Sequence, residues 1–145
     1  MEPAKLFIQF LQSSIAPIAL ISGVGLILLS LTNRLSRTID RSRELIREYK
    51  TSGTERKEIV KKELEILNKR NQYLKSAMAG ISFSILTSSL MIPVLLVMNI
   101  TSVNLNLIGS LLLILSVGGI ILSAIFLFAD VALTLKALEL EMKNL

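Results

Sequence analysis

The chain has 145 residues, of which 52% are hydrophobic, and a formal net charge of +5. Soluble domains are typically about 45–50% apolar even when glycine is counted, so this composition favours a membrane protein. Cysteine and histidine are absent, which excludes disulfides, thiolate metal sites and the commonest general base. Glycine-rich phosphate loops and nucleophile elbows are also absent, so we expect no enzyme, no catalytic residue, no cofactor and no metal site.

The first uncharged stretch predicts one transmembrane helix. Residues 6–33 carry no charge, and their apolar part, about 15–32, is close to the lower limit of a membrane span. A cleavable signal peptide has a basic start and a shorter apolar core, whereas this stretch continues directly into charged sequence. We expect a short interfacial helix over residues 3–13, before Pro17 adjusts the start of the span.

The second uncharged stretch predicts two further spans. It covers 54 consecutive residues, from Ser76 to Ala129. A single helix of this length would be about 80 Å long at 1.5 Å per residue, so the chain must turn back within it. Polar, turn-favouring residues gather between Asn99 and Asn106, which leaves spans at about 76–98 and 107–129.

Residues 33–75, between the first two spans, predict a helical hairpin. Neither proline nor glycine interrupts residues 33–50, and apolar side chains recur at Leu35, Ile39, Ile46 and Tyr49. Gly53 marks the turn. Ser52 or Thr54 can cap the next helix, and Glu55 follows Ser52 by three residues, as in a capping box.

The returning arm repeats residues at heptad spacing, namely Val60, Leu64, Leu67, Asn71 and Leu74. Asn71 has two interpretations: a buried polar residue that fixes the pairing register, or a solvated position in a short seam. The second is favoured, because the seam is only about two heptads long and a sustained coiled coil needs three or four.

The distribution of basic residues predicts the orientation. Residues 34–75 hold 13 of the 16 lysines and arginines, and the 99–106 turn holds none. The positive-inside rule places this hairpin in the cytoplasm, with the N-terminus outside and the helical C-terminal end, 130–145, inside. Anionic lipid headgroups are the expected partners. We expect no nucleic acid, and a cytoplasmic protein partner stays unidentified.

A family resemblance rests on the first span and the residues that follow it. Small residues, including Gly23 and Gly25, are followed by Asn33-Arg34 at the inner end and by Asp40-Arg41, with two more spans beyond. The chain resembles an uncharacterised prokaryotic family of small three-span membrane proteins, a domain-of-unknown-function family. The resemblance implies the three-span architecture and a prokaryotic plasma membrane. It supplies no catalytic motif.

Arginines at the inner membrane boundary are the strongest candidate site. Arg34, Arg37 and Arg41 are spaced i, i+3, i+7 and share one helix face, and Lys75 lies at the same boundary. Together they are candidates for contact with lipid or another anion. The simpler interpretation is membrane anchoring by interfacial arginines, which is favoured, and the alternative is an arginine ring at the mouth of an oligomeric pore.

Asp130 ends the third span at about the level of Arg34 and Lys75. We therefore expect an ion pair of Asp130 with Arg34 or Lys75 that holds the helix ends together. A cation site that adds Asp40 and Glu44 is less favoured, because acidic pairs are common on solvated helices.

Small residues form stripes on the spans. In the first span a stripe that serves helix packing, or lines a pore, comprises Ala16, Ala19, Gly23, Ser30 and Asn33. In the third span Ser116, Gly119 and Ser123 predict helix packing. The hydroxyls of Ser84 and Ser88 in the second span either line a wet cavity, bond to carbonyls of their own helix or bond across to a neighbouring helix, and bonds within their own helix are favoured.

The sequence thus predicts an all-α polytopic membrane domain over residues 1–145. Two functions remain open. The first is a non-enzymatic homo-oligomeric structural or assembly component whose basic hairpin contacts anionic lipid or partners. The alternative is a small oligomeric ion channel, with the first span lining the pore and an arginine-lined cytoplasmic vestibule; three spans in one copy cannot enclose much of a path.

Overall fold

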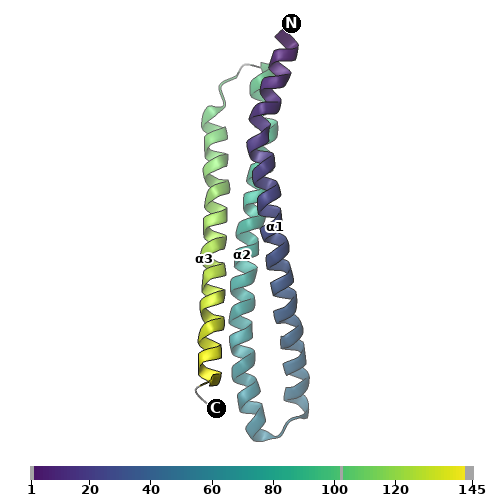
Figure 1. Ribbon diagram of the computed structural model, residues 1–145, viewed down its shortest axis with the longest axis vertical. Helices are drawn as coiled ribbons and strands as arrows, with labels where there is room; N and C mark the ends of the chain where they lie inside the picture. The colour runs from purple at the N-terminus through teal and green to yellow at the C-terminus, as the bar shows by residue number, and fades with distance from the viewer. Residues whose placement is uncertain (1, 102, 143–145) are drawn as a thin grey trace. The chain divides into compact units, whose positions relative to one another are not determined.

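Three long α-helices make up the described chain. The computed structural model describes residues 2–101 and 103–142, and the side chains of residues 4–101 and 103–135. The helices are α1 (Glu2–Thr51), α2 (Thr54–Thr101) and α3 (Asn106–Met142), joined by short connections (Figure 1). Each is long and apolar enough to cross a membrane, and no strand occurs within those ranges. The all-helical, three-span prediction is confirmed.

The chain divides into two compact units, each containing part of every helix. Unit 1 comprises Met1–Leu28 and Ala79–Leu122, and unit 2 comprises Leu29–Met78 and Ser123–Leu145.

Unit 1 buries small polar side chains and exposes large apolar ones. Ser84, Ser88 and Ser116 are at most 2% exposed, whereas Leu107 and Ile114 are 83% and 67% exposed. A protein folded in water has the opposite distribution. Helices packed in lipid meet through small residues, because large apolar side chains gain nothing by leaving an apolar solvent. Unit 1 therefore has the pattern of a membrane-embedded bundle.

The hairpin in unit 2 has an apolar interior of the kind found in water. Leu45 of α1 packs with Val60 and Leu67 of α2, and Leu64 packs against this cluster. Along α2 the predicted seam is buried at Val60, Leu67 and Leu74. Its heptad spacing thus locates the buried face of α2.

The buried face of α1 in unit 2 consists of Leu31, Thr38 and Leu45, seven residues apart. Of the recurring apolar residues of this arm, Leu35 and Ile39 are partly buried, whereas Ile46 and Tyr49 are exposed. Thr38 fits an apolar seam because its hydroxyl donates to the carbonyl oxygen of Leu35 at 2.9 Å, which satisfies the polar group locally. Hydrophobic periodicity overlooks such a residue.

Asn71 departs from the solvated interpretation. Its side chain is partly buried, and its Oδ1 atom is buried without a hydrogen-bond partner among the described residues. The physical reason is the position of Asn71 between Leu67 and Leu74 on the seam, where both neighbours are buried.

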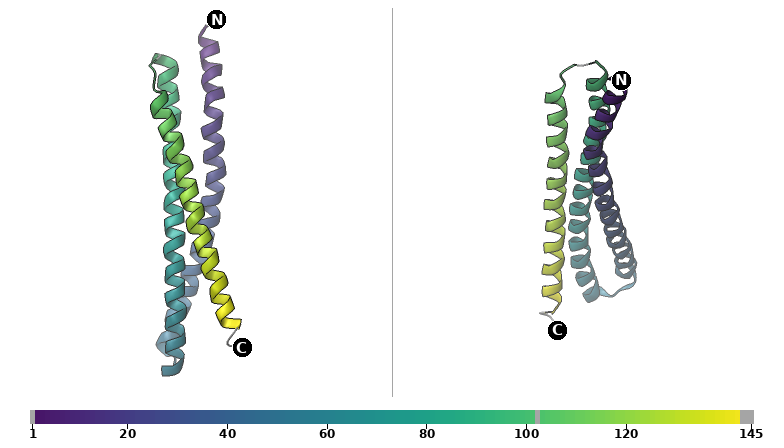
Figure 2. Two further views of the ribbon diagram at one scale, coloured as in Figure 1. Left: turned by 90° about the vertical axis from the view of Figure 1, so that its left-hand side faces the viewer. Right: turned by 45° about the horizontal axis from the view of Figure 1, so that its top comes forward.

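The turn between α1 and α2 consists of Ser52 and Gly53 (Figure 2). The predicted capping box is wrong, because the Ser52 hydroxyl donates to the carbonyl oxygen of Glu48 at 2.7 Å and thus finishes α1. The carbonyl oxygen of Gly53 instead accepts the first bond of α2, from the backbone N–H of Lys57 at 3.1 Å. Arg56 Nε donates to Glu48 Oε1 at 2.8 Å beside this turn.

The N-terminal part of α1 differs from the prediction. In place of a separate helix over 3–13, α1 runs unbroken through Pro17; proline is tolerated within membrane helices, where neighbours and hydroxyls satisfy the freed backbone groups. The second turn falls where predicted, since α2 ends at Thr101 and α3 begins at Asn106, whose backbone N–H is capped by Asn104 Oδ1 at 3.2 Å. Residues 143–145 of the predicted C-terminal extension lie outside the described residues.

Candidate functional site

The candidate site lies in unit 2 and begins with the arginine face of α1. Arg34, Arg37 and Arg41 all border one pocket, as their i, i+3, i+7 spacing allows. They follow directly after the apolar part of α1. All three side chains are exposed, which keeps their guanidinium groups accessible.

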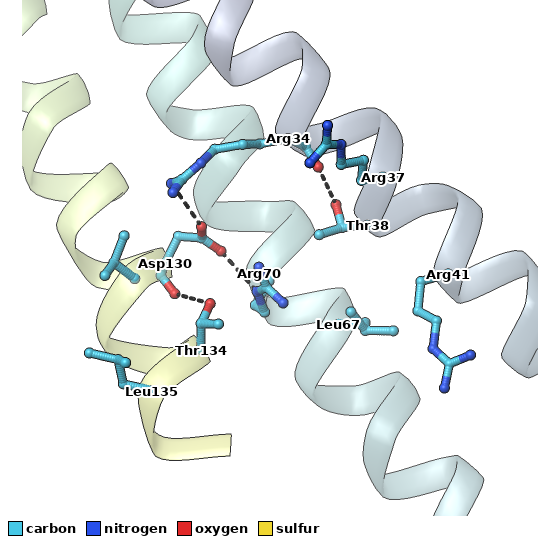
Figure 3. A pocket seen from close by; sticks show the side chains of 10 residues that line it. Arg34, Arg37, Thr38, Arg41, Leu67, Arg70, Asp130, Thr134 and Leu135 are labelled. Atoms are coloured by element: carbon cyan, nitrogen blue, oxygen red, sulfur yellow. Dashed lines mark hydrogen bonds and ion pairs between the residues drawn. The ribbon is translucent and has the colours of Figure 1, made fainter. Parts of the chain in front are cut away.

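Asp130 of α3 is the buried acid of this site. Its side chain is 2% exposed, and its carboxylate lies 3.8 Å from Arg34 Nη1 and 3.1 Å from Arg70 Nε (Figure 3). Burying a carboxylate is costly unless it is paired and hydrogen-bonded. Arg70, only 23% exposed, provides the shorter contact. The pair of arginines therefore makes the buried position of Asp130 tolerable.

Lys75 does not take part in this network within the described residues. Its side chain is exposed, and the partners of Asp130 are Arg34 and Arg70. The expectation that Lys75 would reach Asp130 came from its level along the helix. At 100° per residue, Lys75 is turned about 140° around α2 from Arg70, so it faces away from Asp130.

These residues line an open pocket of about 380 Å³. All three helices contribute to it, and Figure 3 shows Arg34 of α1 and Arg70 of α2 pointing to Asp130 of α3. Its lining comprises Arg34, Arg37, Thr38, Arg41, Leu67, Arg70, Asp130, Val131, Thr134 and Leu135. The volume lies at the lower end of the range for small-molecule sites, about 300–1,000 Å³.

The four arginines of the pocket differ in how far their charge is matched. Arg41 Nη1 donates to Glu44 Oε2 at 2.6 Å, and Glu63 lies 3.9 Å from its Nη2. The hydrogen bond with Glu44 raises the pKa of Arg41 above its ordinary value. Arg34 and Arg70 share the single charge of Asp130. Arg37 has no ion-pair partner among the described residues.

The small-residue stripe of α1 lies on the outside of the molecule. In unit 1, Ala16, Ala19 and Gly23 are exposed, and a Cβ atom built on Gly23 meets nothing within 4 Å. In unit 2, Ser30 and Asn33 are exposed as well. The side of α1 that packs within unit 1 instead carries Ser14, Pro17 and Val24. The stripe is thus not the packing seam of one copy.

The small residues of α3 in unit 1 are packed against α2. Ser116 Oγ lies 3.0 Å from Ser84 Oγ and 2.6 Å from Ser88 Oγ. These bonds cross between helices and correct the expectation of bonds within the second span. Gly119 meets the backbone of α2 so closely that a Cβ atom would lie 2.7 Å from the carbonyl oxygen of Gly80. Ser123, in unit 2, is 2% exposed.

One comparison with known proteins identifies the family. A family model described as a protein of unknown function, DUF2721, matches residues 14–140. The chain belongs to the DUF2721 family. The expected membership of a family of unknown function is thereby confirmed. No curated protein and no solved structure matches this chain.

In this DUF2721 chain, Arg70 is the site residue that sequence reasoning missed. It is one of several basic residues in the returning arm, and nothing in its immediate neighbours distinguishes it. The heptad seam of α2 could have indicated Arg70, because Arg70 follows the buried Leu67 by three residues and therefore lies beside the packed face. Such flanking positions bring a long side chain across to a neighbouring helix.

Proposed function

We propose that this protein is a non-enzymatic, homo-oligomeric component of a plasma membrane, and that its basic hairpin binds anionic lipid headgroups on the cytoplasmic side. The observation that carries the proposal is the exposed arginine face of α1, which follows directly after the apolar part of that helix. Basic residues near the membrane surface are attracted by anionic lipids by about 1 kcal/mol each. The absence of histidine and cysteine supports a role without catalysis.

The cytoplasmic location of the hairpin can be tested directly, because the chain contains no cysteine. Single cysteines at Lys50, beside the hairpin turn, and at Val103, in the second turn, introduce exposed thiols. A maleimide that cannot cross membranes should label Val103→Cys in intact cells and Lys50→Cys only after permeabilisation. The reverse pattern would place the hairpin outside and remove the proposed location.

Self-association is supported by the exposed stripe in unit 1. Small residues let helices approach closely in membranes, and Ala16, Ala19 and Gly23 are exposed among the described residues. Gly23→Leu should therefore reduce the particle size in mild detergent by blocking contact between copies. Gly118→Leu is the matched control, because Gly118 is also exposed with nothing within 4 Å of a Cβ atom. Equal particle sizes for wild type and Gly23→Leu would contradict the proposal.

The same exposed stripe supports a second candidate, a small oligomeric ion channel. In a closed ring, α1 would line the pore and Arg37 would stand in its vestibule, where it would concentrate anions. Reconstituted protein should then conduct anions, and Arg37→Glu should shift the selectivity towards cations. A monomer or dimer in mild detergent would rule this candidate out, since three spans in one copy cannot enclose a wide path.

A further inference from the structure

The arginine pocket of unit 2 has an excess of positive charge. Arg34 and Arg70 share one carboxylate, that of Asp130, and Arg37 adds a charge without an ion-pair partner among the described residues. Arg41 is already matched by Glu44 and Glu63. The balance among Arg34, Arg37, Arg70 and Asp130 is two positive charges, which a ligand with two negative charges would neutralise.

Asp130 holds two of these arginines ready for a ligand. Its contacts use Arg34 Nη1 and Arg70 Nε, while a guanidinium group has five N–H donors in a planar fork. The other donors of both groups stay available within the part of the chain that the structure describes. Because the arginines are already positioned, a ligand would lose less affinity to ordering side chains.

The geometry of guanidinium groups matches phosphate. Arginine binds phosphate oxygens through paired N–H groups, with shorter and stronger bonds than those of neutral donors. A phosphomonoester carries about −1.5 to −2 charges at pH 7, whereas a phosphodiester carries one. The charge balance of the pocket therefore favours the monoester.

Apolar side chains on one side of the pocket point to a lipid. Val131 and Leu135 of α3 are 37% and 62% exposed beside the arginines. The pocket also lies where the uncharged stretches of the sequence give way to charged residues, at Arg34 and Asp130. A lipid headgroup meets both kinds of surface at once, and its acyl chains stay outside a pocket of about 380 Å³.

We propose that this pocket is a specific site for the phosphomonoester headgroup of an anionic lipid, bound by Arg34, Arg37 and Arg70 and positioned by Asp130. The inference rests on the proposed attraction of the hairpin to anionic headgroups and adds a single site with a chemical preference. General attraction depends on net charge alone, so every exposed arginine of the hairpin contributes to it equally. Binding at this site depends on the arginines that border the pocket.

The test uses the full chain in mild detergent and a short-chain phosphatidic acid, with short-chain phosphatidylglycerol as the diester. Binding is read from the rise in melting temperature with lipid concentration. Phosphatidic acid should bind at least about fivefold more tightly. Arg37→Gln should weaken its binding about tenfold, the loss expected for one charge-assisted hydrogen bond. Arg37 has no ion pair to lose within the described residues, so its substitution should leave the lipid-free melting temperature unchanged.

The matched control is Arg43→Gln, which removes the same charge from the same helix. Arg43 is 73% exposed beside Asp40 and does not border the pocket. The Arg43→Gln substitution should weaken phosphatidic acid binding by less than about twofold, since an exposed charge outside the site contributes only screened attraction. Arg37→Lys should recover part of the affinity, because lysine keeps the charge but loses the paired donors.

Other outcomes overturn the site in distinct ways. Equal binding of the two lipids, or equal losses for Arg37→Gln and Arg43→Gln, would refute the pocket and leave general attraction to anionic lipid standing. No binding of either lipid would refute both proposals. Glycerol 3-phosphate binding as tightly as phosphatidic acid would show that the ligand is a soluble phosphate, and tighter binding of a lipid with two phosphodiesters would refute the monoester preference.

Discussion

Gly119 offers the sharpest test of the packing in unit 1. An added Cβ atom would lie 2.7 Å from the carbonyl oxygen of Gly80 and 3.2 Å from both Cβ and N of Ser84. The first of these atoms belongs to the backbone of α2, which cannot rotate out of the way as a side chain can. Gly119→Ala therefore forces α2 and α3 apart.

The loss of stability in Gly119→Ala can be separated from the change in helix propensity by comparison with Gly118→Ala. Overpacking a well-packed site by a methyl group costs about 1–3 kcal/mol. Alanine also gains helix propensity over glycine, about 0.5–1 kcal/mol, and this gain is shared by Gly118→Ala, where a Cβ atom meets nothing within 4 Å. The difference between the two variants therefore isolates the contact, with Gly119→Ala less stable by about 1–3 kcal/mol.

Thermal unfolding of the two variants in the same mild detergent measures this difference. A change of 1 kcal/mol shifts the melting temperature by about 2–4 °C for a chain of roughly this size, so Gly119→Ala should melt about 2–12 °C below Gly118→Ala. If the two variants melt at the same temperature, the close approach of α3 to Gly80 and Ser84 is not the native packing.

Three further predictions concern buried groups. Asp130→Asn should lower the free energy of unfolding by about 1–3 kcal/mol, which is less than the loss for a fully buried ion pair because Arg34 is half exposed. The control is Asp40→Asn, at an exposed ion pair, which should have little effect on the melting temperature. Val60→Ala should lower the free energy of unfolding by about 1–3 kcal/mol, since Val60 is 0% exposed. The control is Ile59→Ala, which should leave the melting temperature almost unchanged because Ile59 is 50% exposed. Ser116→Ala should cost about 0.6 kcal/mol, the average for a hydrogen bond between membrane helices, and an unchanged melting temperature would show that its bonds to α2 contribute nothing.

The helices and turns were predictable because their signals are local. An uncharged stretch too long for one span must turn, and the polar cluster between Asn99 and Asn106 is where it does so. Gly53 marks the hairpin turn for the same reason, since glycine and its neighbours interrupt helical periodicity.

The buried faces were harder to predict because they depend on partners. Thr38 is buried in an apolar seam because its hydroxyl donates to the backbone carbonyl of Leu35. A search for apolar residues at helical spacing therefore does not detect it. Ser84 and Ser88 bond across to Ser116, although each could equally bond within its helix. The choice between these partners is made by the packing of α2 against α3, which no spacing along one helix specifies.

The sequence predicted part of the candidate site. The spacing of Arg34, Arg37 and Arg41 showed one face, and the position of Asp130 showed its level. The choice of Arg70 over Lys75 required the rotation of α2 about its axis, which is fixed by the burial of residues such as Leu67 and Leu74. Counting residues along the sequence predicts the position of a residue along the helix axis more readily than the side of the helix that faces a neighbour.

The opposite burial patterns of the two units have a consequence for denaturant experiments. The slope of stability against urea scales with the surface newly exposed to water on unfolding. Unit 1 keeps large apolar side chains such as Leu107 on its outside, so separating its helices in detergent brings little new apolar surface into water. The hairpin around Val60 would expose its interior fully. A urea titration therefore measures the cohesion of the hairpin, and only heat or a change of detergent measures that of the membrane bundle.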